Sequence, residues 1–147
     1  MTAVVLCCTD AQAALGDVPQ SGRPGSAVPG AAVWQQTSLA GSSSTVSSAV
    51  LASGTTLREW TNAAGQVFAV SWTGPLLPDL AALLGDAFAD YQEAVRLQHV
   101  AGFRGAVIQV QKAGLVLVSR GRMGQFEGHA YRPALVPADV NIKALWP

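Results

Sequence analysis

Hydrophobic and polar residues alternate along residues 56–72, which is the pattern of half-buried β-strands. The alternation is interrupted by Asn-Ala-Ala-Gly at 62–65. Asparagine favours the first position of a type I turn, and glycine tolerates the left-handed conformation that closes a hairpin, so we expect two strands joined here. Because paired residues share one face of a sheet, the pairs predict a buried aromatic face. The expected pairs are Trp60 with Phe68, Arg58 with Val70, and Thr56 with Trp72.

A helical spacing of apolar residues begins after Pro78, which suits the first helical position, and Asp79, which suits the positive end of the helix dipole. Gly85 interrupts this spacing at a cost of about 1 kcal/mol relative to alanine. We therefore expect one helix with a kink, or a break into two helices. The apolar stripe consists of Leu80, Leu83, Leu84, Ala87, Phe88, Tyr91 and Val95.

Further strands are expected on both sides of this helix, and prolines at 133 and 137 end the regular pattern before a final helical turn over 138–145. Hairpins before and after one amphipathic helix predict an α+β fold. In this fold an antiparallel sheet packs against one main amphipathic helix, with the order β-β-(β)-α-β-β-β. The additional strands are expected at 45–51, 106–111, 115–120 and 125–132.

The first 44 residues are expected to lie outside this domain, which would comprise residues 45–147. Residues 1–13 resemble the end of a secretory signal peptide, because a short apolar stretch precedes Ala-Gln-Ala, the small-x-small pattern that signal peptidase accepts. We interpret them as a remnant truncated by a start codon assigned too late, with cleavage before Ala14. Residues 14–44, rich in Gly, Pro and Ser, predict a flexible, disordered leader that contains Trp34. A frayed cytosolic N-terminus is the alternative to export.

Composition and charge narrow the classes of function. Of the 147 residues, 50% are hydrophobic and 12% are charged, whereas an average globular protein has about 25% charged residues. No apolar run approaches the roughly 18 residues that a membrane span needs, so no transmembrane segment is expected. Nine basic and nine acidic residues give zero net charge. A chain without a positive field is not expected to bind nucleic acid.

Recognisable catalytic and metal-binding motifs are absent from the sequence. It has no His-x-x-x-His or Cys-x-x-Cys spacing, no Gly-x-Ser-x-Gly and no phosphate-binding glycine motif after a strand. A catalytic zinc usually takes three protein ligands, and the chain after the expected cleavage site offers only His99 and His129 with no cysteine. We therefore expect neither a metal nor a cofactor.

One predicted strand carries the candidate site. Along residues 125–131, Glu127, His129 and Tyr131 alternate onto one face, and Arg120 and Arg122 lie across the hairpin turn. A carboxylate beside an imidazole, a phenol and two guanidinium groups could bind an anion or support general acid–base chemistry. The first three are thus candidate catalytic residues, and the two arginines are candidate ligand-binding residues. The alternative is that a half-exposed antiparallel sheet always has one polar face.

Charged residues suggest a partner as well. Residues 77–100 have a net charge of −3 and residues 101–132 a net charge of +4. If the basic residues cluster, the partner would be an anionic envelope component or an acidic protein. Alternatively, sheet edges collect lysine and arginine because these prevent edge pairing. Arg58 has predicted aromatic neighbours and is a further ligand-binding candidate, because it could form a cation–π contact. The alternative is that its methylene groups lie along the aromatic rings while its guanidinium group stays in water.

Two segments carry a family resemblance. The stretch ASGTTLREWTNAAGQVFAVSWTGPLLPDLAALLG at 52–85 resembles the core signature of an exported proteobacterial family known only as domain of unknown function 2844. The stretch LVLVSRGRMGQFEGHAYRPALVPADV at 115–140 is similar to that family's second half, and Ala-Leu-Gly at 14–16 resembles its usual mature start. The resemblance implies a signal peptide and a periplasmic or secreted location. It implies no catalytic residues.

Two hypotheses of function follow. The first is an exported, non-catalytic binding or scaffolding module of the cell envelope, and the alternative is a small envelope hydrolase that uses Glu127, His129 and Tyr131. An enzyme should hold these side chains in a concave pocket, whereas a binding module should present them on a flat polar face beside an exposed apolar patch. A third hypothesis is an intramolecular one, in which Trp34 docks the leader onto the sheet.

Overall fold

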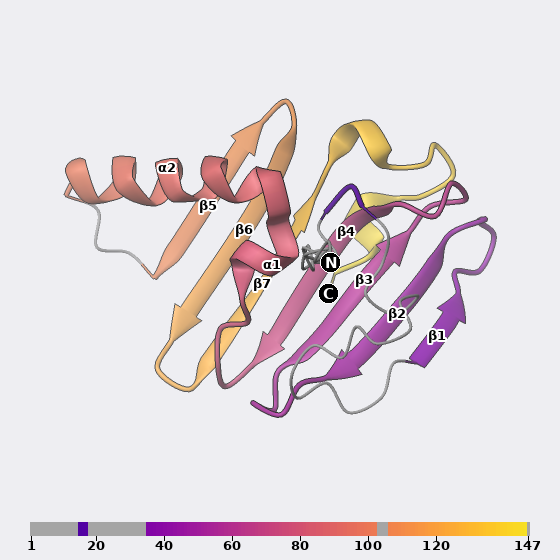
Figure 1. Cartoon of the computed structure of the whole chain (residues 1–147), viewed down its shortest axis with the longest axis horizontal. Helices are drawn as coiled ribbons and strands as arrows, with labels where there is room; N and C mark the ends of the chain where they lie inside the picture. The colour runs from indigo at the N-terminus through magenta and orange to yellow at the C-terminus, as the bar shows by residue number, and fades with distance from the viewer. Residues whose placement is uncertain (1–14, 18–34, 103–105, 147) are drawn as a thin grey trace, which may run out of the picture.

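Seven antiparallel strands form one sheet in the computed structural model of the chain, which describes residues 15–17, 35–102 and 106–146 (Figure 1). Their order across the sheet is β1-β2-β3-β4-β7-β6-β5, so the strands before and after the helical segment meet where β4 pairs with β7. This arrangement confirms the predicted α+β fold. The strands are β1 (Gln35–Ser38), β2 (Thr45–Val50), β3 (Thr56–Thr61), β4 (Val67–Gly74), β5 (Val107–Lys112), β6 (Leu115–Arg122) and β7 (Gln125–Tyr131).

The helical segment between β4 and β5 lies on one face of the sheet and breaks at Gly85 (Figure 1). Before α1 (Leu80–Leu84), the Asp79 carboxylate accepts hydrogen bonds from the first N–H groups of the helix at 3.0 and 3.2 Å. Gly85 has a φ of 53°, a conformation that glycine adopts without steric cost. A 3-10 turn (Gly85–Ala87) then leads into α2 (Phe88–Val100), so the expected break into two helices is confirmed. Among the described residues, no helix is long and apolar enough to cross a membrane.

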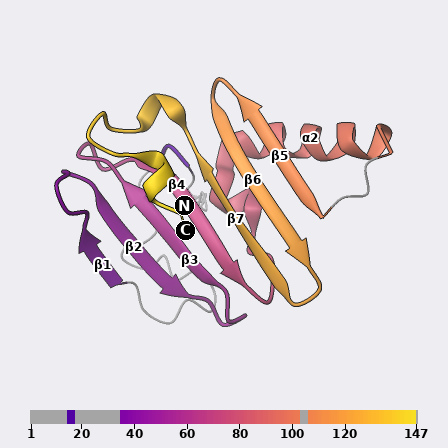
Figure 2. The ribbon, with the colours of Figure 1, turned by 180° about the vertical axis from the view of Figure 1, so that it is seen from behind.

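Apolar side chains are buried on both faces of the sheet. On the helix face, α1 packs against residues of β3, β4, β6 and β7, including Trp72, which is 1% exposed. On the opposite face, Trp60 and Phe68 form a second cluster with residues of the C-terminal segment 133–146 (Figure 2). That segment contains two 3-10 turns, Pro133–Leu135 and Ile142–Ala144, so the expected helical turn covers only part of 138–145.

The β3–β4 hairpin differs from its expected register by one residue. Trp60 lies opposite Ala69, Arg58 opposite Ser71 and Thr56 opposite Thr73, and the register shifts between Trp60 and Thr61. The expected pairs with Phe68, Val70 and Trp72 are therefore wrong. An extra residue in one strand of a bulge moves the following side chains to the other face. As a result Val70 and Trp72 belong to the helix-face core, and Arg58 has small hydroxyl residues as its neighbours.

Two parts of the predicted leader belong to the fold. β1 pairs with β2 over four residues, and Leu15 is 2% exposed in the helix-face core. The N–H groups of Leu15 and Gly16 donate hydrogen bonds to the carbonyls of Leu83 and Val67 at 2.9 and 2.7 Å. A flexible leader over 14–44 and a domain boundary at 45 are thus wrong for residues 15–17 and 35–44, where burial and pairing offset the entropy of ordering. Residues 18–34, with Trp34, and the expected signal remnant lie outside the described residues.

Candidate functional site

The polar face predicted on β7 is present and lies on the side of the sheet opposite the helices. Ala130 is buried in the helix-face core, so its neighbours His129 and Tyr131 point to the other side. The register places Arg58 of β3, Ser71 of β4 and His129 of β7 in one row across three strands. Thr73, Glu127 and Arg120 form the next row across β4, β7 and β6. Strand pairing therefore brings together residues that are far apart in the sequence.

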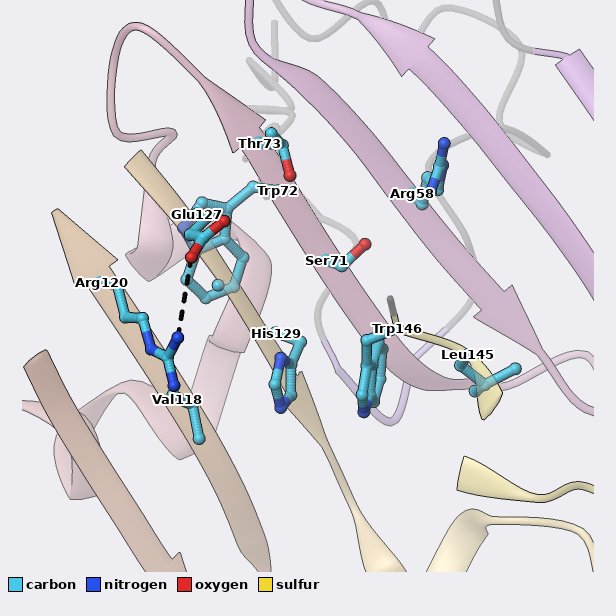
Figure 3. A pocket seen from close by; sticks show the side chains of 11 residues that line it. Arg58, Ser71, Trp72, Thr73, Val118, Arg120, Glu127, His129, Leu145 and Trp146 are labelled. Atoms are coloured by element: carbon cyan, nitrogen blue, oxygen red, sulfur yellow. Dashed lines mark ion pairs between the residues drawn. The ribbon is translucent and has the colours of Figure 1, made fainter. Parts of the chain in front are cut away.

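A cavity of about 210 Å³ opens above these two rows (Figure 3). Figure 3 shows Arg58 on one side of Ser71 and His129, and Arg120 on the other. The C-terminal segment completes the wall with Leu145 and Trp146. Residues of four strands and of the chain's end thus line one hollow. The polar side chains that line it are Arg58, Ser71, Thr73, Arg120, Glu127 and His129.

His129 lies against an aromatic ring that is close to the end of the chain. Its imidazole stacks on the indole of Trp146 with ring centroids 4.3 Å apart and planes at 12°. Trp146 also meets Trp60 edge-on at 5.3 Å, which holds the C-terminal segment on the sheet. Burial lowers the pKa of His129 below its ordinary value of 6.5, and the positive charge of Arg120 lowers it further. The ring is therefore mostly neutral at pH 7 and offers one N–H donor and one acceptor.

Arg120 and Glu127 form an ion pair across the β6–β7 hairpin. The distance between Nη1 of Arg120 and Oε1 of Glu127 is 3.9 Å, and their side chains are 61% and 52% exposed. An exposed pair at this distance contributes about 0–1 kcal/mol. A guanidinium group has five N–H donors, so Arg120 keeps donors that can bind a ligand.

The structure brings four of the six candidate residues to this cavity: Arg58, Arg120, Glu127 and His129. Tyr131 does not line it, and its ring is 6.2 Å from that of Trp146. Arg122 lies two residues beyond Arg120, opposite Gln125 at the end of the hairpin. Arg58 reaches the cavity, but among the described residues it has no cation–π contact. Its role as a ligand-binding residue stays a prediction, as do those of the others.

Trp146 and Ser71 line the cavity but were not candidates in the sequence. Ser71 enters the row of Arg58 only because the bulge changes the register of β4. Trp146 is 75 residues further along the chain than Ser71 and follows two prolines, so no local pattern predicts where it packs. A lone tryptophan near the end of a short, mostly apolar segment was the one available signal, because such a large side chain usually packs against another surface.

The basic residues of 101–132 are divided between the two faces of the sheet. Lys112 lies on the helix side, where its Nζ contacts Asp90 at 2.7 Å and Glu93 at 3.0 Å. These hydrogen bonds raise the pKa of Lys112. Arg120 and Arg122 lie on the opposite face, and Arg104 is outside the described residues. Lys112 therefore neutralises part of the acidic charge of α2, and Arg120 lines the cavity. The guanidinium of Arg132 lies elsewhere, beside Gly16.

The cavity combines charged groups with groups that form hydrogen bonds. It offers guanidinium donors, a carboxylate, two hydroxyl groups and a neutral imidazole. Within residues 15–17, 35–102 and 106–146, no group of three His, Cys, Asp or Glu side chains is placed to hold a metal ion. Nor does a hydrogen bond join Glu127 to His129 in this part of the chain. The arrangement can bind a ligand that carries both negative charge and hydrogen-bonding groups.

Comparison with known proteins agrees with the resemblance seen in the sequence. The chain matches no curated protein and no solved structure. A family model described as "Protein of unknown function (DUF2844)" matches residues 11–145. This match covers every residue of the cavity and of both core clusters except Trp146, and the chain therefore belongs to the DUF2844 family.

Proposed function

We propose that this protein is an exported, non-catalytic binding module, and that the cavity of about 210 Å³ binds a negatively charged group of a cell-envelope component. The observation that carries the proposal is the convergence of Arg58, Arg120 and His129 from three different strands on one hollow. Ligand sites are typically concave and combine a largely apolar wall with a few convergent polar groups. Leu145 and Trp146 supply the apolar wall here.

The electrostatics of the cavity support an anionic ligand. Arg58 and Arg120 carry two positive charges, and Glu127 carries one negative charge. Arginine presents a planar fork of N–H donors that matches the geometry of a carboxylate or a phosphate. An anion would also favour the protonated form of His129, whose pKa burial holds low in the free protein. The site can therefore gain a third positive charge when an anion binds.

The hydrolase alternative has less support than binding. Catalytic side chains that act together, such as a carboxylate that orients an imidazole, lie within hydrogen-bond reach of each other, at about 2.6–3.2 Å. Glu127 instead contacts Arg120, and no hydrogen bond links it to His129 among the described residues. Tyr131 lies outside the cavity walls. A carboxylate and an imidazole that act separately can bind a ligand without transferring a proton.

A titration with small anions tests the proposal. We expect glucuronate and inorganic phosphate to shift the NMR signals of His129 and of the Trp146 indole, and glucose, which has no charge, to leave them unchanged. Arg120→Gln should weaken glucuronate binding about 10- to 100-fold, because hydrogen bonds to charged groups contribute about 1.5–3 kcal/mol. Arg96→Gln, an exposed arginine on α2, is the matched control and should bind like the native protein. Equal shifts with glucose, or equal binding by Arg120→Gln, would contradict the proposal.

Export rests on the cleavage pattern at Ala11–Ala13. Every residue that the structure describes follows that site, so cleavage before Ala14 would keep the whole described fold. We expect the protein recovered from the periplasm, expressed from a gene extended to the next upstream start codon, to begin at Ala14. N-terminal sequencing measures this directly. Recovery from the cytosol with an intact Met1 would overturn the export proposal and leave the binding proposal standing.

A further inference from the structure

We propose that the ligand is an acidic oligosaccharide, and that it lies along a continuous groove from Arg58 to Arg122. This inference rests on the proposed function, because it identifies the ligand of the same cavity. It goes further by adding a second subsite and by naming the class of ligand. The argument comes from the neighbouring cavity, the spacing of the arginines and the mixture of groups along the groove.

A second cavity of about 420 Å³ adjoins the first on the same face of the sheet. Arg120 and Glu127 line both cavities, so their side chains form the boundary between the two. Beyond them the second cavity is lined by Arg122 and Gln125 at the end of the β6–β7 hairpin, and by Val107 of β5. The two hollows therefore make one groove, and its far end carries a third guanidinium group.

The spacing of the three arginines fits a ligand with repeated charges. Arg58 and Arg120 lie on strands three steps apart in the sheet, which corresponds to about 14 Å across the strands. Arg120 and Arg122 are two residues apart on one strand, which corresponds to about 7 Å. A single carboxylate or phosphate cannot contact groups so far apart. A linear chain with an anionic group on successive units can contact all three.

The other groups of the groove favour a sugar over an acidic peptide. β4, β7 and β6 each have a paired neighbour on both sides, so their backbones cannot add a peptide as a further strand. Glu127 stands between the arginines, where it would repel a ligand that carries only acidic groups. A uronic acid brings hydroxyl groups that donate to this carboxylate, as well as carboxylates that accept from the arginines. Ser71 and Thr73 add hydroxyl partners in the first cavity.

The length of the ligand separates this inference from the proposed function. Isothermal titration calorimetry would compare galacturonate with tetragalacturonate, using the native protein, Arg122→Gln and the Arg96→Gln control. We expect the native protein and the control to bind the tetramer at least tenfold more tightly than the monomer. Arg122→Gln should lose most of this gain and keep its affinity for the monomer, because Arg122 lines only the second cavity.

Each contrary result has a distinct meaning. If the native protein binds the monomer but gains nothing from the tetramer, or if Arg122→Gln retains the full gain, the extended groove is refuted and the single-site proposal stands. If a tetraglutamate peptide binds as tightly as tetragalacturonate, the ligand class is wrong. If neither the monomer nor the tetramer binds, the inferred ligand class is wrong, and if glucuronate and inorganic phosphate also fail to bind, the proposed function itself fails.

Discussion

Replacing Leu15 with alanine is expected to lower the free energy of unfolding by about 2–5 kcal/mol, the usual cost of truncating a buried leucine. Leu15 is 2% exposed and packs in the helix-face core with Leu83 and Leu84 of α1. Backbone hydrogen bonds from Leu15 and Gly16 fix this segment between α1 and β4. Denaturant unfolding followed by circular dichroism would measure the change as a lower midpoint with an unchanged slope.

Leu97→Ala provides the matched control for Leu15. Leu97 lies on α2 and is 53% exposed, so the same truncation should change the free energy of unfolding by no more than about 0.5 kcal/mol. Similar small effects of both substitutions would mean that Leu15 is not part of the cooperative core. The expected difference has a consequence for processing, because cleavage before Ala14 would leave Leu15 as the second residue of the mature chain. Any trimming past that point would remove a core side chain.

Local periodicity was sufficient to predict most of the elements, because each signal lies within a few residues. The alternation along β7 correctly placed Glu127, His129 and Tyr131 on one face. The helical stripe and Gly85 predicted both the helix and its break. Asp79 was correctly expected at the helix start, and the structure shows that its carboxylate caps α1.

Features that depend on long-range packing could not be predicted in this way. β1 is a short edge strand in a Gly- and Ser-rich context, and it is held by pairing with β2 rather than by its own composition. Leu15 is a single leucine among small residues with no strand or helix periodicity, so its burial depends on the gap that it fills between α1 and β4. The bulge near Trp60 inserts one residue, and a single insertion exchanges the two faces of every later pair.

The candidate site shows the same division between local and distant signals. Glu127 and His129 share a strand, and Arg120 lies across a short hairpin, so a pattern in the sequence was enough to group them. Arg58 reaches the same cavity only because β4 pairs with β7, a contact between two halves of the chain that local periodicity does not specify. Trp146 lines the cavity from the C-terminal segment, which follows the last strand. A site on the face of a sheet is thus assembled by strand order, which is a property of the whole fold.

Gly128→Ala is expected to destabilise the fold by about 1–3 kcal/mol, the usual range for overpacking a filled site. Gly128 lies on β7 between Glu127 and His129, and the Trp72 ring covers it from β4. A Cβ atom placed there would be 2.7 Å from Cε2 of Trp72 and 2.7 Å from the carbonyl oxygen of Val118. Because Trp72 is 1% exposed and packs in the helix-face core, a displacement of its ring disturbs the packing of that core. Either the ring or β7 must shift.

Gly114→Ala is the control for this clash, since a Cβ atom there meets no heavy atom within 4 Å and the backbone has no positive φ. Thermal unfolding should therefore show a clear loss of stability for Gly128→Ala and little change for Gly114→Ala. Alanine has a better strand propensity than glycine, so a stabilised Gly128→Ala protein would mean that Trp72 does not press on β7. The expected loss would instead show that position 128, between Glu127 and His129, must be glycine. The reason is that β7 carries the proposed binding groups on one face and packs against the Trp72 ring on the other.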